Sequence, residues 1–84
     1  MPTITNFYGI SIRMFFLGNE HNPPHFHAYY NNAEATFDIK TLALIDGYLP
    51  RRAAKMVKEW AQVHQSELLR IWESQEFERL APLE

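Results

Sequence analysis

The stretch His25–Ile39, HFHAYYNNAEATFDI, decides the fold of this chain. It predicts two extended segments, His25–Tyr30 and Ala33–Ile39, which are joined by the pair Asn31-Asn32. Asparagine tolerates a positive φ, so a two-residue primed turn is the natural connection between the two segments. The sequence therefore predicts an antiparallel hairpin whose tip lies at the two asparagines.

The predicted turn sets which residues lie opposite each other, and this register separates the side chains by polarity. His25 is expected opposite Asp38, and Phe26 opposite Phe37. A slip by one residue would mix the polar and apolar sets and would bury charge. The apolar face of the hairpin would carry Phe26, Ala28, Tyr30, Ala35 and Phe37, and the polar face His25, His27, Tyr29, Glu34, Thr36 and Asp38.

The rest of the first half predicts further short strands around this hairpin. One opening strand is expected from Ile4 to Phe7, and another from Leu42 to Ile45, which ends at a turn formed by Asp46-Gly47. Between them lies a run in which two sets of side chains alternate, as expected for a strand. The first set is Ile10, Ile12, Met14 and Phe16, and the second is Ser11, Arg13, Phe15 and Leu17.

The second half of the chain has the periodicity of a helix. Pro50 opens it at the first helical position, where a missing N–H costs nothing. An apolar stripe at spacings of three and four then runs from Ala53 to Trp72. One straight helix of that length is too long for so small a domain, so we expect a break near His64, with Ser66 capping a second segment. The predicted fold is α+β: a single domain, 1–84, with a small antiparallel sheet of three to five strands packed against a C-terminal helix or two consecutive helices.

Composition and charge exclude several classes of function. Eighty-four residues without cysteine allow neither a disulfide framework nor a thiolate site, and they fit a reducing cytoplasm. The N-terminus has no signal-peptide pattern, and no apolar run is long enough to span a membrane, so we expect no membrane partner. The net charge of −2 argues against a broad phosphate-binding surface. Nucleic acid would have to bind at a local basic patch.

Three of the four histidines lie in the segment His21–His27. On a strand, His25 and His27 project to the same side, about 6.5–7 Å apart along the strand. His21 on the preceding loop could fold back toward them and, with Asp38, complete a zinc or iron site. The alternative is that the histidines only shape a solvent-facing loop, and no other cofactor is expected.

The same residues also suggest catalysis without a metal. His25 would act as a general base oriented by Asp38, and His27 would act as the acid. Arg13, expected on the neighbouring strand, would stabilise the charge of a phosphorane, as the transphosphorylation of RNA requires. The alternative is an ordinary cross-strand pair between a histidine and an aspartate, which contributes a few tenths of a kcal/mol.

Two further pairs of residues indicate a binding surface. Arg51 and Arg52 lie in the first turn of the predicted helix, where the macrodipole disfavours cations, so an anion or a partner carboxylate could bind there. The alternative is that both side chains point outward into solvent. Phe15 and Leu17 lie on the face that should be polar, which indicates that a partner covers it.

Four motifs occur together along the chain: Met1-Pro2-Thr3-Ile4, the segment His21–His27, Leu49-Pro50-Arg51-Arg52, and Trp60-x3-His64-x2-Glu67-Leu68-x3-Trp72. This combination resembles the small bacterial family known as domain of unknown function 4160. The resemblance implies a bacterial, cytoplasmic protein whose gene often lies beside that of another small protein, in an arrangement similar to toxin–antitoxin pairs. It favours a component that binds a small partner protein or forms a homo-oligomer, with RNA as a further candidate target. A metal-binding domain and a pure interaction module remain the alternatives.

Overall fold

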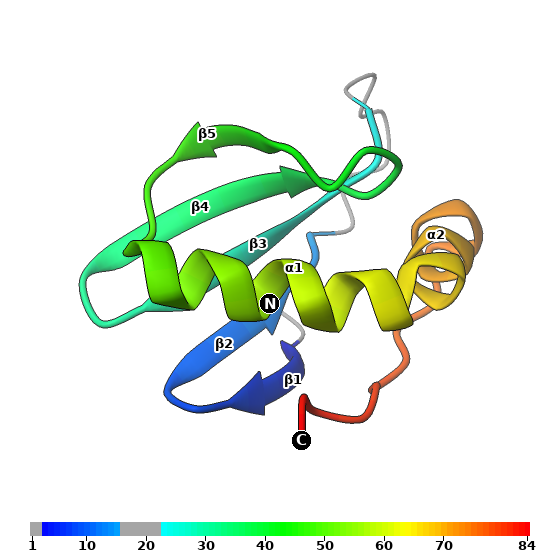
Figure 1. The fold of residues 1–84 in the computed structure, drawn as a ribbon. Helices are drawn as coiled ribbons and strands as arrows, with labels where there is room; N and C mark the ends of the chain where they lie inside the picture. Colours follow the sequence, from blue (N-terminus) through cyan, green and yellow to red (C-terminus); the bar gives the residue numbers. More distant parts are fainter. Residues whose placement is uncertain (1–2, 16–22) are drawn as a thin grey trace.

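A computed structural model describes residues 3–15 and 23–84, and these form an antiparallel sheet followed by two helices (Figure 1). The strands are neighbours in chain order, so the sheet is a meander with the order β1-β2-β3-β4-β5. The predicted α+β class, with a sheet in the first half and two consecutive helices in the second, is confirmed. The elements are β1 (Thr3–Phe7), β2 (Ile10–Arg13), β3 (His25–Tyr30), β4 (Ala33–Asp38), β5 (Leu44–Gly47), α1 (Arg51–Val63) and α2 (Gln65–Ser74).

The hairpin of β3 and β4 has the register that the two asparagines predict. Asn31 has a φ of 53°, as the first position of a primed turn requires. His25 pairs with Asp38, and Phe26 with Phe37. The alternation therefore sends Phe26 into the core, fully buried, and leaves His27 on the opposite face.

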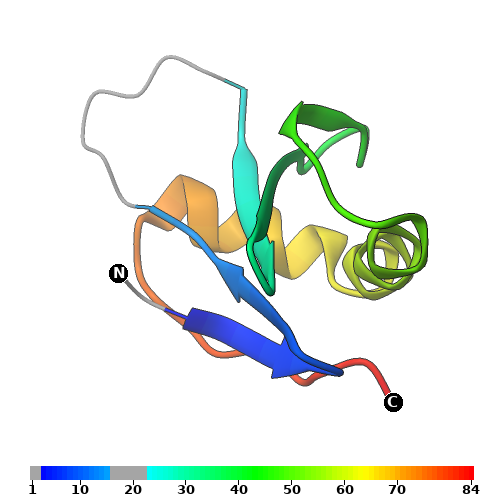
Figure 2. The same ribbon diagram turned by 90° about the vertical axis from the view of Figure 1, so that its left-hand side faces the viewer.

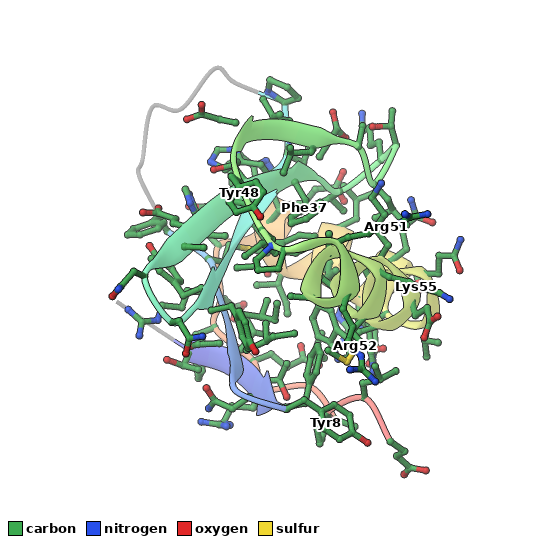
Figure 3. The ribbon with its side chains drawn as sticks, turned by 60° about the vertical axis from the view of Figure 1, so that its left-hand side comes forward. Tyr8, Phe37, Tyr48, Arg51, Arg52 and Lys55 are labelled. Atoms are coloured by element: carbon green, nitrogen blue, oxygen red, sulfur yellow. The ribbon has the colours of Figure 1, made fainter. Side chains whose placement is uncertain are left out.

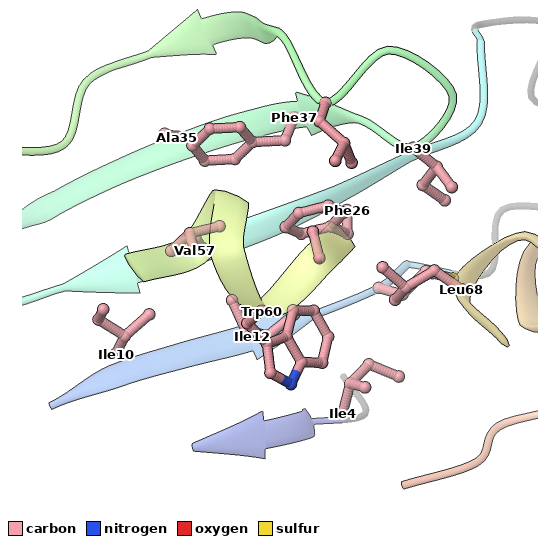
Figure 4. Packing of buried hydrophobic residues seen from close by; sticks show 14 of the residues in the cluster. Ile4, Ile10, Ile12, Phe26, Ala35, Phe37, Ile39, Val57, Trp60 and Leu68 are labelled. Carbon is pink, nitrogen blue, oxygen red and sulfur yellow. The ribbon is translucent and has the colours of Figure 1, made fainter. Parts of the chain in front are cut away.

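The core lies between the apolar face of the sheet and α1, which crosses that face (Figures 1 and 4). The rings of Phe26 and Phe37 stack with centroids 5.5 Å apart, and Trp60 of α1 meets Phe26 edge-on at 6.1 Å. Such ring pairs add about 0.5–1.5 kcal/mol to the free energy gained from burial. These contacts hold the sheet so that only its other face is left for function.

The C-terminal residues return to the edge of the sheet. The indole N–H of Trp60 donates a hydrogen bond to the carbonyl of Ala81 at 2.7 Å. The amide of Leu80 donates to the carbonyl of Ile4 in β1, at 3.1 Å. These two bonds and the burial of Leu80 attach Leu80 and Ala81 to the domain.

The strand predicted from Leu42 to Ile45 is shifted along the chain. Leu42 is buried in a turn with a φ of 63°, and β5 begins only at Leu44 and continues through the predicted turn residues to Gly47. The pairing with β4 is interrupted by a bulge, because Thr36 lies opposite Asp46 whereas Phe37 lies opposite Leu44. The alternation rule could not anticipate a turn that requires a left-handed leucine.

The helical half breaks at His64, as predicted. His64 is both the C-cap of α1 and the N-cap of α2, with a φ of −108°, and Ser66 lies inside α2 and does not cap it. The His64 Nδ1 lies 2.6 Å from the Glu67 carboxylate. The side-chain amide of Gln65 donates to the main-chain carbonyls of Ile39 and Lys40, both at 2.8 Å. These bonds attach the start of α2 to the end of β4.

Candidate functional site

The face of the sheet opposite α1, which we call the outer face, is the candidate site. Alternate side chains of β2, β3 and β4 project there, because α1 and the core occupy the other side. The turned view in Figure 2 shows how the twist of the sheet sets β1 and β2 obliquely to β3. Trp72 of α2 reaches this face at one end. The outer face comprises Arg13, Phe15, His25, His27, Tyr29, Glu34 and Thr36.

The outer face carries a continuous row of rings. His27 lies at its centre, 4.4 Å from Phe15, 5.3 Å from His25 and 6.5 Å from Tyr29 between ring centroids. Trp72 of α2 contacts the far side of His25 at 4.9 Å. All five side chains are partly exposed, so the row is a surface feature and not a second core.

A cation lies at the other end of the row. Arg13 pairs with His27 across β2 and β3, as expected from the adjacency of the strands. Its guanidinium carbon lies 4.6 Å from the centre of the Tyr29 ring, and its Nε donates to the hydroxyl of Ser11 at 3.2 Å. A cation above an aromatic face gains about 0.5–1 kcal/mol at exposed sites. The arginine is therefore held flat against the row.

The expected pair of His25 and Asp38 is opposite in register, but in the described part of the chain no hydrogen bond joins the two side chains. Asp38 accepts hydrogen bonds from the amides of Lys40 and Thr41, at 2.7 and 3.1 Å. These donors follow directly in the turn after β4, so the carboxylate reaches them with little loss of conformational entropy. The Asp38 side chain thus stabilises a turn.

His25 instead bonds to its own loop. Its Nδ1 lies 2.9 Å from the carbonyl of Pro23. A carbonyl only accepts, so Nδ1 must carry a proton, and Nε2 is the ring nitrogen left available to a substrate. This is the arrangement that a proton-transferring histidine requires.

His27 has the carboxylate partner that was expected for His25. Its Nδ1 lies 3.5 Å from Glu34 Oε2 and 3.3 Å from Thr36 Oγ1. Burial of the ring lowers the pKa of His27, as does the neighbouring His25, and Glu34 opposes this shift only in part. His27 is therefore neutral at neutral pH. Burial and Glu34 together raise the pKa of the Tyr29 hydroxyl.

Sequence reasoning placed Glu34 and Thr36 on the polar face but gave neither a role in the site. The signal was present, because the register puts Thr36 directly opposite His27 and Glu34 one pair further along the same face. A diagonal neighbour on the same face lies within reach of a long side chain. Trp72 carried no such signal, because its contact with His25 depends on where α2 ends up after the helix break.

A shallow hollow of about 330 Å³ opens beside the two histidines. The bulge in β5 places two consecutive side chains, Ile45 and Asp46, along its rim. Ile45 is 48% exposed, so an apolar side chain meets solvent next to the imidazoles. The hollow is lined by Pro23, His25, His27, Thr36, Ile45 and Asp46.

Two of the predicted site residues, Leu17 and His21, lie outside the described residues. In residues 3–15 and 23–84, no three side chains of His, Cys, Asp or Glu gather in a way that could hold a metal ion. His25 and His27 alone supply two free imidazole nitrogens, and a zinc site needs three or four protein ligands. The predicted metal set would thus depend on His21.

Arg51 and Arg52 lie on α1 and belong to a different surface. Both are exposed in the first turn of the helix, which has no acidic residue and no side-chain cap. The structure therefore separates the predicted anion-binding arginines from the histidines and Phe15.

No helix of the described residues is long and apolar enough to cross a membrane.

Comparison with known families identifies the chain. The model of the family DUF4160, a domain of unknown function, matches residues 9–73. The match begins before β2 and ends near the close of α2, so it includes the outer face and both helices. This chain belongs to the DUF4160 family, and the resemblance seen in its motifs is confirmed. No curated protein and no solved structure matches the chain.

Proposed function

We propose that this protein is one component of a toxin–antitoxin-like pair, which binds a partner protein through its outer face and acts on RNA there. One observation carries the proposal: a row of partly exposed rings ending in an arginine lies on a sheet face that the described helices leave largely open. Aromatic residues and arginine are the residues enriched at protein interfaces. Ile45, 48% exposed beside the histidines, extends the apolar area toward the sheet edge.

The contacts of the two histidines support the RNA-directed part. The neutral His27, with Glu34 and Thr36 at its Nδ1, is suited to accept a proton from a ribose 2′-hydroxyl at Nε2. The 2′-oxygen then bonds to phosphorus and the bond from phosphorus to the 5′-oxygen breaks. His25 enters this step as the imidazolium, with its Nδ1–H bonded to the Pro23 carbonyl, and delivers the proton of Nε2 to the leaving oxygen. Arg13 stabilises the added negative charge. This assignment exchanges the base and acid roles expected from the sequence, because the carboxylate lies beside His27.

The partner-binding part is tested by co-expression with the product of the neighbouring gene. Light scattering after gel filtration should detect a complex with a defined stoichiometry, or a homodimer if the partner is a second copy. The double variant Phe15→Ser/Tyr29→Ser should weaken the complex at least tenfold, as expected when interface anchors are removed. Tyr8→Ser changes an exposed tyrosine away from the outer face and is the matched control. A protein that stays monomeric with and without the partner would contradict the proposal.

The RNA-directed part is tested with a labelled single-stranded RNA in the presence of EDTA. We expect cleavage that falls about 10²–10⁴-fold in His27→Ala and in His25→Ala, the range for loss of a general acid or base. His64→Ala, at the helix junction, is the control. A DNA strand of the same sequence lacks the attacking 2′-hydroxyl and should stay intact. Cleavage of that DNA would refute transphosphorylation. Activity that EDTA abolishes, with about one bound metal per chain, would favour the metal site with His21.

A further inference from the structure

The exposed side of α1 concentrates positive charge in a chain that is negative overall. Four of the eight Lys and Arg residues lie within this helix, against one acidic residue, Glu59. The other four Lys and Arg are outnumbered by nine Asp and Glu in the remainder of the sequence. Such a distribution attracts an anion to one side of the molecule and repels it from the others. We call Arg51, Arg52, Lys55 and Lys58 the basic stripe.

The basic stripe is not neutralised within the protein. All four side chains are exposed, and no ion pair joins any of them to another residue of the described chain. The first turn of α1 also lacks an acidic residue, although that position favours one. Unpaired cations at this end of the helix lower the stability of the fold, and no contact within the described chain compensates for this. This arrangement is expected of a binding surface for a polyanion.

The spacing of the charges suits an extended chain of phosphates. Arg51, Lys55 and Lys58 follow one another at intervals of four and three residues, so they share one side of the helix. The rise of about 1.5 Å per residue separates them by roughly 6 and 4.5 Å along the axis. A hollow of about 440 Å³ lies between them, and it is lined by these three cations together with Ala54, Glu59 and Gln62.

Two exposed tyrosines accompany the basic stripe. Tyr48, 66% exposed, lies three residues before Arg51, the first residue of α1, and Tyr8, 62% exposed, lies in the turn between β1 and β2. In Figure 3 both rings lie around the first turn of α1: Tyr8 lies below Arg52, and Tyr48 lies across the helix from Arg51 and Lys55. Exposed aromatic rings beside a cationic groove are the combination that binds unpaired bases, because rings stack on bases while cations contact the backbone.

We propose that the basic stripe, with Tyr8 and Tyr48, is a binding surface for single-stranded RNA. An acidic protein segment would use the cations but would leave the two tyrosines without a role, and a duplex would keep its bases stacked out of their reach. The inference rests on the RNA-directed function proposed above and assigns the substrate a second contact surface, on the opposite side of the sheet from His25 and His27. It explains how a protein with a net charge of −2 can bind RNA.

The test measures binding without cleavage. Fluorescence anisotropy follows a fluorescein-labelled 2′-O-methyl oligouridylate of 12 nucleotides, which has no free 2′-hydroxyl and so stays intact whether or not the outer face is catalytic. The logarithm of the binding constant should fall with the logarithm of salt concentration with a slope of about −3, as expected for four contacts to a single strand. Replacing all four residues of the basic stripe by alanine should abolish this slope and weaken binding more than tenfold. Alanine favours helices, so α1 should persist, which circular dichroism checks.

Matched variants separate charge from stacking. Tyr8→Ala/Tyr48→Ala should weaken binding at least about thirtyfold with an unchanged salt slope, because stacking does not release counterions. Lys40→Ala removes an exposed cation outside the basic stripe and should change affinity less than twofold. Equal binding of a 12-residue oligoglutamate, preference for a duplex, or full affinity in the alanine variant of the stripe would each overturn the proposal. Binding of this uncleavable oligonucleotide and cleavage of RNA are measured separately, so failure of this proposal (no binding by the basic stripe) and failure of the proposed function (no cleavage) are distinguishable.

Discussion

Replacing Gly47 by alanine should destabilise the protein far more than the same change at Gly9. Both glycines have a φ of 81°, a conformation in which an alanine costs about 1–2 kcal/mol. A Cβ on Gly47 would also lie 2.2 Å from the carbonyl oxygen of Glu34 and 3.0 Å from the Cα of Ala35. Real contacts of this kind are about 1 Å longer, so β4 and β5 must separate.

Separation of β4 from β5 would break a backbone hydrogen bond and would also displace Glu34, the partner of His27. The amide of Tyr48 donates to the same Glu34 carbonyl at 2.9 Å, and loss of this bond costs about 0.5–1.5 kcal/mol. The restricted unfolded state of alanine offsets about 0.4–1 kcal/mol. We expect a net loss of about 2–4 kcal/mol for Gly47→Ala, or a fall in Tm of roughly 10–25 °C for a domain of this size. Because Glu34 is the partner of His27, cleavage and partner binding should weaken as well.

Urea denaturation followed by circular dichroism measures the difference, and Gly9→Ala is the control. A Cβ on Gly9 would meet only the Tyr30 ring, at 3.4 Å, which is ordinary contact. The free energy of unfolding of Gly9→Ala should therefore fall by only about 1 kcal/mol. This is the cost of the positive φ less the stabilisation that comes from the restricted unfolded state. If Gly47→Ala were as stable as Gly9→Ala within about 0.5 kcal/mol, the close approach of β5 to β4 would be wrong.

Three further predictions concern His27 on the outer face and the hydrogen bonds that attach the C-terminal residues and α2 to the sheet. Because the folded state lowers the pKa of His27, the unfolded chain binds the proton more readily, and the free energy of unfolding should fall as pH drops below about 6.5. His27→Gln should reduce this dependence in urea titrations at pH 7.5 and 5.5, and an identical pH dependence in both proteins would contradict it. Trp60→Phe removes the hydrogen bond to Ala81 and should lower the free energy of unfolding by about 1–2 kcal/mol. Hydrogen exchange should show faster exchange of the Leu80 amide. Unchanged protection of that amide would contradict the attachment of the C-terminal residues by this bond. Gln65→Ala loses two bonds to the main chain after β4 and should cost a similar amount by urea denaturation, whereas Gln62→Ala, one turn earlier and exposed, should cost less than about 0.5 kcal/mol.

The hairpin shows how much of the site was predictable. Alternation and the turn at Asn31-Asn32 suffice to place His25 and His27 on one face and Phe26 on the other, because side-chain direction in a strand depends only on parity. The break at His64 was equally predictable, since an unbroken helix exceeds the dimensions of the domain. The N-cap residue of α2 was not predictable, because several adjacent residues could fill the N-cap position.

The side-chain partners were not predictable by the same rules. Parity places Asp38 opposite His25, but it does not reveal that the amides of Lys40 and Thr41 compete for the carboxylate at shorter range. Nor does it reveal the bulge that brings Ile45 and Asp46 beside the histidines, since that depends on a left-handed turn at Leu42. Each of these outcomes is a competition between a local hydrogen bond and a more distant one.

The sequence by itself determined the order of the elements, the register of the central hairpin and the face on which each hairpin residue lies. These follow from periodicity and turn chemistry, which act over a few neighbouring residues. Only the tertiary structure decided that Trp72 closes one end of the ring row and that Tyr8 lies on the same side as Arg52 of the basic stripe. Those juxtapositions join segments far apart in the chain, so they arise only when the helices pack onto the sheet.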